Sequence, residues 1–292
     1  MAVLGLDIGG SKTQAALAEN GTVIAEALAG SANVTSVGPD AAGEQLDLVL
    51  ERLGSPRITT VVAGAAGVDT PAGEARLQEL LASRLPDARI RVVHDSQIIL
   101  AAAGVLDGIA LISGTGSVAW GRRDGVSARA GGLGYLLGDE GSGYWVAKEA
   151  VRRSLVRLDL GKPADLLGQQ LAADCGLQSP HELLDHFYAQ PERRYWAGRA
   201  RVVFEMAKTG DLVSSDIVAT AAKELAALVI AVAERLESSG PVVLAGGLAV
   251  NQPALQAGIR ENLADRNIGD VRVLTVDPVR GAVELAHRLA FD

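Results

Sequence analysis

The sequence contains a single cysteine, Cys175, and few aromatic side chains. One cysteine excludes a disulfide within the chain, and it excludes a zinc or iron–sulfur site built from several thiolates. Aromatic residues make up 3 % of the composition, so the apolar residues, at 48 %, are mainly Ala, Leu and Val. We therefore expect closely packed helices and strands built from small side chains.

Basic clusters and long apolar runs are also missing. The net charge is −8 and no run of Lys or Arg occurs, so we expect no nucleic-acid partner. No segment reaches about 18 uninterrupted apolar residues, the length of a membrane span, so we expect no membrane partner. The first residues, MAVLGLDIGG, lack the basic start of a signal peptide, which favours a cytoplasmic protein.

What the sequence does contain is one pattern of elements that occurs twice. In both copies an apolar strand runs into a glycine turn, and two further strands follow, joined by a polar turn (Asn20-Gly21 in the first copy, RRDG in the second). The predicted strands are 2–8, 13–19 and 22–27 in the first copy and 108–113, 117–121 and 126–129 in the second.

The repetition continues through strand–helix units. The runs 58–66 and 242–249 are predicted buried strands; the later strands 90–93 and 271–276 lead into helices that end near Ala103 and Leu289. Amphipathic helices are predicted at about 40–53 and 72–85, and a helical insertion at 140–238.

A length of 292 residues favours two domains. We expect two α/β domains of one topology: residues 1–107, joined by the C-terminal helix 279–292, and residues 108–278, which carry the insertion. Ligands in such folds bind where strand ends and their turns converge, which predicts a site in the cleft between the domains.

The stretch 131–145, GGLGYLLGDEGSGYW, holds six glycines. This density predicts a backbone that passes close to a ligand or adopts positive φ. A helix is predicted to begin within 140–145, and its N-terminus could favour an anion. A long surface loop with a packing role is an equal alternative.

Two glycine turns are candidate phosphate sites. Asp7 precedes the first turn, which comprises Gly9, Gly10, Ser11, Lys12 and Thr13. The glycines let backbone amides approach a phosphate, Lys12 or Thr13 could contact it, and Asp7 could hold a magnesium ion through water. The second turn, Gly114-Thr115-Gly116, occupies the equivalent place, and the pair favours polyphosphate binding over two unrelated hairpin turns.

Asp95 has two interpretations of equal weight. It follows a predicted strand and starts a helix, so it could be an N-cap. It could equally be the base that accepts a proton from an attacking hydroxyl in phosphoryl transfer. For His94 we favour a partly buried strand residue. Gly246 and Gly247 could let a flat adenine pack on the backbone.

Four segments in this order, DIGGSKT, ISGTGS, GGLGYLLGDEGSGYW and VLAGGLAVN, resemble the phosphate-1, phosphate-2, GDEGS and adenosine motifs of N-acetylglucosamine kinases. These kinases belong to the BadF/BadG/BcrA/BcrD group of the actin, hexokinase and heat-shock ATPase superfamily. The resemblance spans residues 3 to about 288. It implies duplicated ribonuclease H-like (actin-like ATPase) domains, with ATP and Mg²⁺ as cofactors and an amino sugar as substrate.

The resemblance also implies roles for individual residues. Asp95 is similar to the base that activates the 6-hydroxyl of the sugar, and Gly246 and Gly247 to adenosine-site glycines. Residues implied to lie beside the sugar are Asn33, Asp95, Thr115, Gly132, Leu133 and Asp139. Leu133 departs from the pattern, because many members carry tryptophan there; this leaves the exact sugar, including whether its amine is acetylated, open. A homodimer is left open as well.

Two other functional classes compete with the kinase. Dehydratase activators of the same group couple ATP hydrolysis to a partner protein, but they hold an iron–sulfur cluster through paired cysteines, which one cysteine cannot supply. Regulators of the bacterial repressor/kinase family resemble the chain at DIGG, but their cysteine-rich zinc motif is absent. Both rank below a hexosamine kinase.

Overall fold

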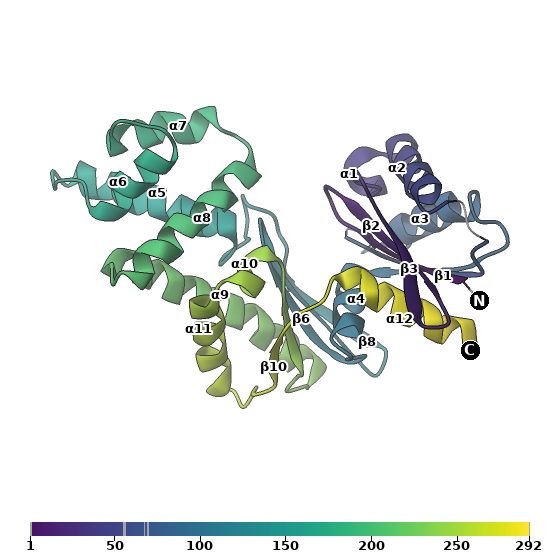
Figure 1. Ribbon diagram of the computed structural model, residues 1–292. Coiled ribbons are helices and arrows are strands. Elements are labelled where there is room, and N and C mark those ends of the chain that lie inside the picture. Colours follow the sequence, from purple (N-terminus) through teal and green to yellow (C-terminus); the bar gives the residue numbers. More distant parts are fainter. Residues whose placement is uncertain (1, 55–56, 67, 69, 292) are drawn as a thin grey trace. The chain divides into compact units, whose positions relative to one another are not determined.

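The computed structural model describes residues 2–54, 57–66, 68 and 70–291. They divide into two compact units (Figure 1). Unit 1 comprises Met1–Leu106 and Leu274–Asp292, and unit 2 comprises Asp107–Val273. The chain therefore returns to the first unit at Leu274, whereas the sequence predicted a return at residue 279.

Unit 1 is built on a five-stranded sheet of order β3-β2-β1-β4-β5. Its strands are β1 (Ala2–Ile8), β2 (Thr13–Glu19), β3 (Thr22–Ala29), β4 (Thr60–Ala65) and β5 (Arg89–His94). The first three are antiparallel neighbours, whereas β4 and β5 run parallel to β1. Asn20 and Gly21, both with positive φ, form the predicted turn between β2 and β3.

Helices cover both faces of this sheet. They are α1 (Val34–Val37), α2 (Pro39–Arg52), α3 (Pro71–Ala82), α4 (Asp95–Ala102) and α12 (Pro278–Phe291). Successive residues of β1 face opposite sides. Leu4 and Leu6 belong to the core under α2 and α3, and Val3 to the core under α4 and α12.

The last helix packs on the first unit, as the sequence predicted. Two glycines permit the close approach. A Cβ on Gly5 of β1 would lie 2.6 Å from the Val283 nitrogen, and a Cβ on Gly281 would lie 1.9 Å from the Ile98 oxygen of α4. Figure 1 shows α12, in yellow, lying beside α4.

Unit 2 repeats the topology of unit 1, with the strand order β8-β7-β6-β9-β10. The strands are β6 (Gly108–Ser113), β7 (Ser117–Arg123), β8 (Val126–Gly131), β9 (Val242–Ala245) and β10 (Val271–Val273). Again three antiparallel strands precede two that run parallel to the first. The predicted duplication and fold class are thereby confirmed.

Between β8 and β9 the chain forms the predicted helical insertion. It comprises α5 (Gly143–Asp159), α6 (Leu166–Asp174), η1 (Pro180–Glu182), α7 (Leu183–Ala189), α8 (Arg193–Lys208) and α9 (Leu212–Leu236). Helices α10 (Gly247–Asn251) and α11 (Pro253–Ala264) follow β9. Trp196 and Phe204 of α8 are fully buried in the core that the insertion shares with the sheet.

Several predicted boundaries were wrong. The strand expected over 242–249 ends at Ala245, because Gly246 has φ +86° and α10 begins at the next residue. The strand expected over 271–276 ends at Val273, whereas the helix predicted to begin within 140–145 does begin there, at Gly143. The turn expected at RRDG is confined to Asp124-Gly125, and both arginines belong to β7.

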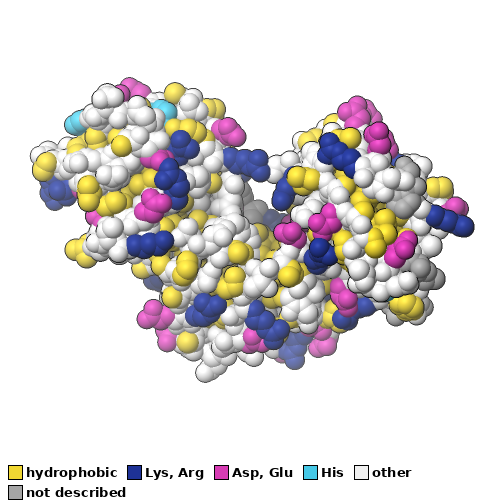
Figure 2. All heavy atoms as spheres, in the orientation of Figure 1, with side chains coloured by type: hydrophobic (Ala, Val, Ile, Leu, Met, Phe, Trp, Pro, Cys, Tyr) yellow, Lys and Arg dark blue, Asp and Glu magenta, His cyan; other side chains and the backbone are white. Residues whose placement is uncertain are grey.

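The surface carries charges of both signs. Figure 2 shows basic and acidic side chains interspersed over the visible face of each unit. Among the helices of the described residues, none combines the length and the apolar composition that crossing a membrane requires.

Candidate functional site

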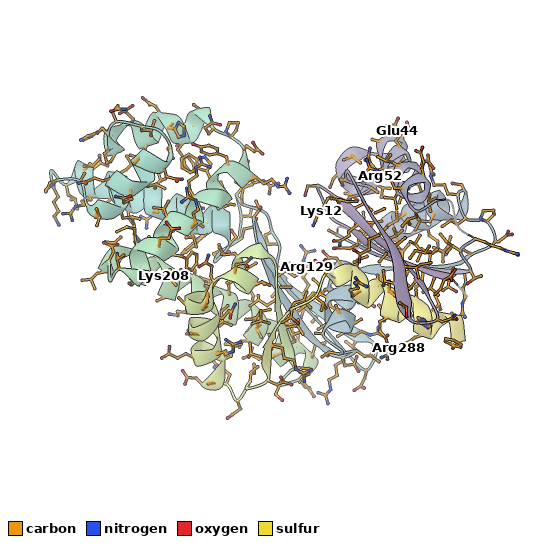
Figure 3. All side chains as sticks on the ribbon, in the orientation of Figure 1. Lys12, Glu44, Arg52, Arg129, Lys208 and Arg288 are labelled. Atoms are coloured by element: carbon orange, nitrogen blue, oxygen red, sulfur yellow. The ribbon has the colours of Figure 1, made fainter. Side chains whose placement is uncertain are left out.

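The first glycine turn links β1 to β2 in unit 1. The Gly9 amide donates to the Lys12 carbonyl at 2.9 Å, and the Ser31 hydroxyl donates to the Gly9 carbonyl at 2.8 Å. Gly10, Ser11 and Lys12 are exposed at its tip. Figure 3 shows the Lys12 side chain extending away from the sheet. The tip thus offers a cation and small residues to an anion.

Thr13 has a role inside unit 1, and the contact with a phosphate that the sequence suggested stays a prediction. Its side chain is fully buried, and its Oγ1 accepts a hydrogen bond from the Ala32 amide at 2.8 Å. The hydroxyl therefore joins the turn to the connection after β3.

Asn33 lies in that same connection and caps the short helix α1. Its Oδ1 accepts the amides of Thr35 and Ser36, and its Nδ2 donates to the Ala66 carbonyl at 2.8 Å. The side chain is 5 % exposed. Its oxygen is thus committed to the helix, and a role toward a sugar stays a prediction.

Three carboxylates gather at one end of unit 1. Asp7 lies on the same face of β1 as Val3 and Gly5, the face that α4 and α12 cover. Asp95 is the first residue of α4, and Asp277 directly precedes α12.

Gln14 ties this group together. It is the cross-strand partner of Asp7, and its Nε2 donates to Asp277 Oδ2 at 3.3 Å. The pKa of Asp7 is shifted by the same neighbouring charges. Burial, followed by the charge of Asp95, raises the pKa of Asp7 to about 6; Lys12 lowers this pKa and Asp277 raises it.

Asp95 is not the N-cap of α4. That place belongs to His94, whose Nδ1 accepts the Ser96 amide at 3.3 Å. Asp95 Oδ1 is buried, lies 3.0 Å from His94 Nδ1, and accepts no hydrogen bond within the part of the chain that the structure describes. A buried carboxylate oxygen without a donor is costly, so this atom is a strong candidate to receive a ligand hydroxyl.

The second glycine turn links β6 to β7 in unit 2. The Gly114 amide donates to the Gly116 carbonyl at 3.0 Å, and Thr115 between them is half-buried. The stretch 131–145 is bonded to this turn at several points. The Gly143 amide donates to the Gly114 carbonyl at 2.8 Å, and the Ser117 hydroxyl to the Glu140 carbonyl at 2.7 Å.

Asp139 lies directly beneath this turn. It is 5 % exposed and has φ +62°, and its Oδ1 accepts the Ser117 amide at 3.2 Å. A Cβ on Gly116 would come within 2.9 Å of Asp139 Oδ2, so the turn needs glycine there. The carboxylate therefore supports the turn, and its predicted contact with a sugar hydroxyl remains untested.

The glycines of 131–145 serve the protein's own packing. Gly131, Gly132, Gly134 and Gly141 have positive φ, and a Cβ on Gly141 would lie 2.5 Å from Leu225. The expectation that the backbone passes close to a ligand is therefore not needed to explain them.

Other contacts define the two ends of this stretch. Arg129 donates to the Gly132 carbonyl at 2.6 Å, and Figure 3 labels this arginine beside β8. Ser142 caps α5 by accepting the Trp145 amide. Between these ends, Leu133 is 65 % exposed.

Gly246 and Gly247 differ sharply in their surroundings. A Cβ on Gly246 would lie 2.4 Å from the Ser113 oxygen, whereas one on Gly247 would meet nothing within 4 Å. Gly246 is required by the fold, and Gly247 presents open backbone on which a flat ring can pack.

Comparison with known proteins identifies the family. The model of the BadF/BadG/BcrA/BcrD ATPase family matches residues 4–286. The chain belongs to this family. The family name indicates ATP as the nucleotide.

Relatives within reach of sequence comparison are kinases. The N-acetylmuramic acid/N-acetylglucosamine kinase of Clostridium acetobutylicum is 32 % identical over 301 residues, 98 % of each chain. The N-acetyl-D-glucosamine kinase of Dictyostelium discoideum is 30 % identical over 312 residues, 97 % of each. A solved structure from Porphyromonas gingivalis has a TM-score of 0.77 at 24 % identity, covering 98 % of this chain and 99 % of its own, which shows the fold.

In this family member the structure thus brings Asp7, Asp95 and the first turn together in unit 1. It brings Thr115, Gly116, Gly132, Leu133 and Asp139 together in unit 2. That the two sets meet in one cleft stays a prediction.

Sequence reasoning missed Asp277, Gln14, Ser31 and Arg129 as members of these sets. For Asp277 a signal existed, because it occupies in the second copy the place that Asp95 holds in the first.

Proposed function

We propose that this chain is an ATP-dependent sugar kinase that phosphorylates the 6-hydroxyl of an amino sugar, with N-acetylglucosamine as the favoured acceptor. The observation that carries the proposal is the Asp95 carboxylate, which has a buried Oδ1 without a donor beside a second carboxylate and a glycine turn. The two kinase relatives, similar over nearly their whole length, support the same reaction.

Asp95 would act as the base. A sugar hydroxyl donating to Oδ1 satisfies the orphan oxygen, is oriented for attack, and loses its proton to the carboxylate as the phosphoryl group transfers. Oδ1 accepts no hydrogen bond from the described residues, so no donor there competes with the sugar hydroxyl, while His94 Nδ1, 3.0 Å away, already accepts the Ser96 amide.

Asp7 fits a magnesium ion. Its pKa of about 6 reflects burial together with the negative charges of Asp95 and Asp277, an excess that a divalent cation would relieve. Among the described residues, no group of three His, Cys, Asp or Glu side chains is arranged so that it could hold a metal ion, which suits an ion that usually takes one or two carboxylates plus phosphates and waters. Bound magnesium neutralises charge on the transferring phosphoryl group.

The remaining residues would position the two substrates. The turn at Gly9, Gly10, Ser11 and Lys12 and the turn at Gly114, Thr115 and Gly116 would contact the phosphates of ATP, and Gly246 and Gly247 its adenosine. For the sugar we propose contacts with Asn33, Thr115, Gly132, Leu133 and Asp139. Because catalysis of phosphoryl transfer consists mainly of positioning and electrostatics, such contacts supply much of the rate.

A glucosamine kinase is the second candidate. Leu133 is exposed where the resemblance leads to the expectation of an indole ring, and the loss of that ring leaves open whether the amine of the acceptor is acetylated. An ATPase activator of a partner protein ranks lower, because Cys175 is the sole cysteine.

The test is ADP formation with ATP and Mg²⁺ against glucosamine, N-acetylglucosamine, glucose and N-acetylmuramic acid, with NMR locating the phosphate on the product. We expect strong stimulation by one amino sugar and a phosphate on carbon 6. Stimulation by none of the sugars would overturn the kinase proposal and favour the activator class.

A further inference from the structure

A pair of tyrosines in unit 2 is flanked by two cations. Tyr135 and Tyr144 meet edge to face, with ring centroids 5.4 Å apart. The Arg193 guanidinium lies 5.2 Å from the Tyr135 centroid, and Lys148 Nζ lies 5.9 Å from that of Tyr144. We call these four residues the cation–tyrosine cluster.

The cluster adjoins the residues proposed to bind the sugar. Tyr144 follows Gly143, whose amide donates to the Gly114 carbonyl of the second turn. Tyr135 lies two residues after Leu133. The chain turns back between Leu133 and Gly138, since a Cβ on Gly138 would lie 3.1 Å from the Leu133 Cβ. Asp139, which supports the second glycine turn, directly follows Gly138.

Neither cation of the cluster forms an ion pair with the residues that the structure describes. Within the described ranges no carboxylate lies within 4.0 Å of Arg193 or Lys148, whereas Arg152 and Arg153, one turn further along α5, pair with Glu149 and Asp216. Two neighbouring unpaired cations are notable in a chain of net charge −8. Their combined field favours an anionic ligand.

Aromatic side chains of the helical insertion pack against the cluster. The Tyr144 ring packs on Phe187, which packs on Trp196 with centroids 4.6 Å apart, and Trp196 is 1 % exposed. The pKa of Tyr144 is raised by burial and by Tyr135 and lowered by Arg193, so its phenol stays a hydrogen-bond donor near neutral pH. Donors fixed in this way lose little freedom when a ligand binds.

We propose that the cation–tyrosine cluster binds a carboxylate substituent of the acceptor sugar, with Arg193 as the specificity-determining residue. A guanidinium presents its donors in a planar fork that matches a carboxylate, and Arg193 Cζ lies over the Tyr135 ring. The inference rests on the proposed kinase function and deepens it, because it adds amino sugars that carry a carboxylate to the acceptors and names the residue that would recognise that carboxylate.

The experiment isolates charge from size. N-acetylmuramic acid is N-acetylglucosamine with a carboxylate on a 3-O-lactyl ether, and its methyl ester has nearly the same shape without the charge. For the wild-type chain we expect kcat/KM to be about tenfold higher for the acid than for the ester, the effect of one solvent-open hydrogen bond to a charged group.

Variants assign the effect to Arg193. Arg193→Gln should give equal kcat/KM for acid and ester while keeping wild-type kcat/KM for N-acetylglucosamine, which also shows that the variant is folded. Arg193→Lys should keep part of the preference. The matched control, Arg194→Gln, removes the neighbouring charge and should keep all of it.

Other outcomes overturn the inference. If Arg193→Gln raises the KM for ATP equally with every acceptor, Arg193 binds the nucleotide phosphates instead. If the wild type phosphorylates N-acetylglucosamine but does not prefer the acid to its ester, the inference fails and the kinase function stands. If no sugar is phosphorylated, the kinase function fails first.

Discussion

At the scale of single residues, Asp95 stands apart from the other carboxylates of unit 1 by its orphan oxygen. We expect Asp95→Asn to lower kcat by a factor of about 10² to 10⁴, the usual contribution of a general base, since the amide cannot accept the proton. Calorimetry should show ATP binding within about twofold of the wild type. Turnover at the wild-type rate in this variant would remove Asp95 from the mechanism.

Asp7 leads to a prediction about stability and pH. Its pKa is about 6 in the folded chain against an ordinary value of 3.8, so the native state binds a proton that the unfolded state releases between these values. The stabilisation from that proton is complete below pH 3.8 and is lost as the pH rises through 6. Above that pH the buried charge costs up to about 3 kcal/mol.

Asp7→Asn should therefore be more stable than the wild type by about 1–3 kcal/mol at pH 7.5 and should lose this advantage near pH 4. Urea unfolding at both pH values, with EDTA to exclude metals, measures the difference. An advantage of equal size at both pH values would show that Asp7 does not ionise in this range.

Whether the role of a single residue could be predicted from the sequence depends on which residues it contacts. Asp7 and Asp95 stood out because strand ends and glycine turns lie beside them. The internal role of Thr13 was hidden, because its partner, the Ala32 amide, comes 19 residues later. The duplication marked the position of Asp277, but its link to Asp7 was hidden, because it runs through the side chain of Gln14, a tertiary contact without a local pattern.

At the scale of elements, the junction of β9 and α10 contains a matched pair of glycines. Gly246 has φ +86° and ψ 147°, a region almost restricted to glycine, and its side toward Ser113 is closed. We expect Gly246→Ala to cost about 2 kcal/mol or more of the free energy of unfolding.

Gly247→Ala should leave that free energy unchanged or slightly higher, because alanine favours a helix and space is open there. It should raise the KM for ATP roughly tenfold, a loss of about 1.4 kcal/mol, if adenine packs on this backbone. Chemical unfolding and ATP titration of both variants check the pair. An unchanged KM in Gly247→Ala would remove this glycine from the nucleotide site.

Strands were predictable as elements because buried β runs are continuous and apolar, and glycine turns separate them. The ends of the strands were harder to predict. The apolar character of 242–249 continues past Ala245, and only the positive φ of Gly246 ends the strand. The helix predicted to begin within 140–145 begins at Gly143, where Ser142 supplies its cap.

At the scale of the whole molecule, α12 completes unit 1 from the far end of the chain. In Gly281→Ala the new Cβ would collide with the backbone of α4, so α12 has to move off the sheet. Hydrogen exchange on the full chain should then show lost protection in β1, β4 and α4, with unit 2 unchanged.

The control for this prediction is Gly198→Ala in α8. A Cβ on Gly198 meets nothing within 4 Å, so this change should stabilise the chain by up to about 1 kcal/mol. Equal exchange in Gly281→Ala and the wild type would mean that α12 can be loosened without cost to unit 1.

The return of α12 also determines the order in which the halves mature during synthesis. Unit 2 is one continuous stretch, but unit 1 lacks a wall of its core until residues 274–291 have been made. At 5–20 residues per second, the first sheet waits roughly 10–40 s for that wall, with one apolar face covered only in part, by α4. A ribosome that stops shortly before residue 274 therefore releases an intact second half and an unfinished first half, which is a ready substrate for chaperones and proteases.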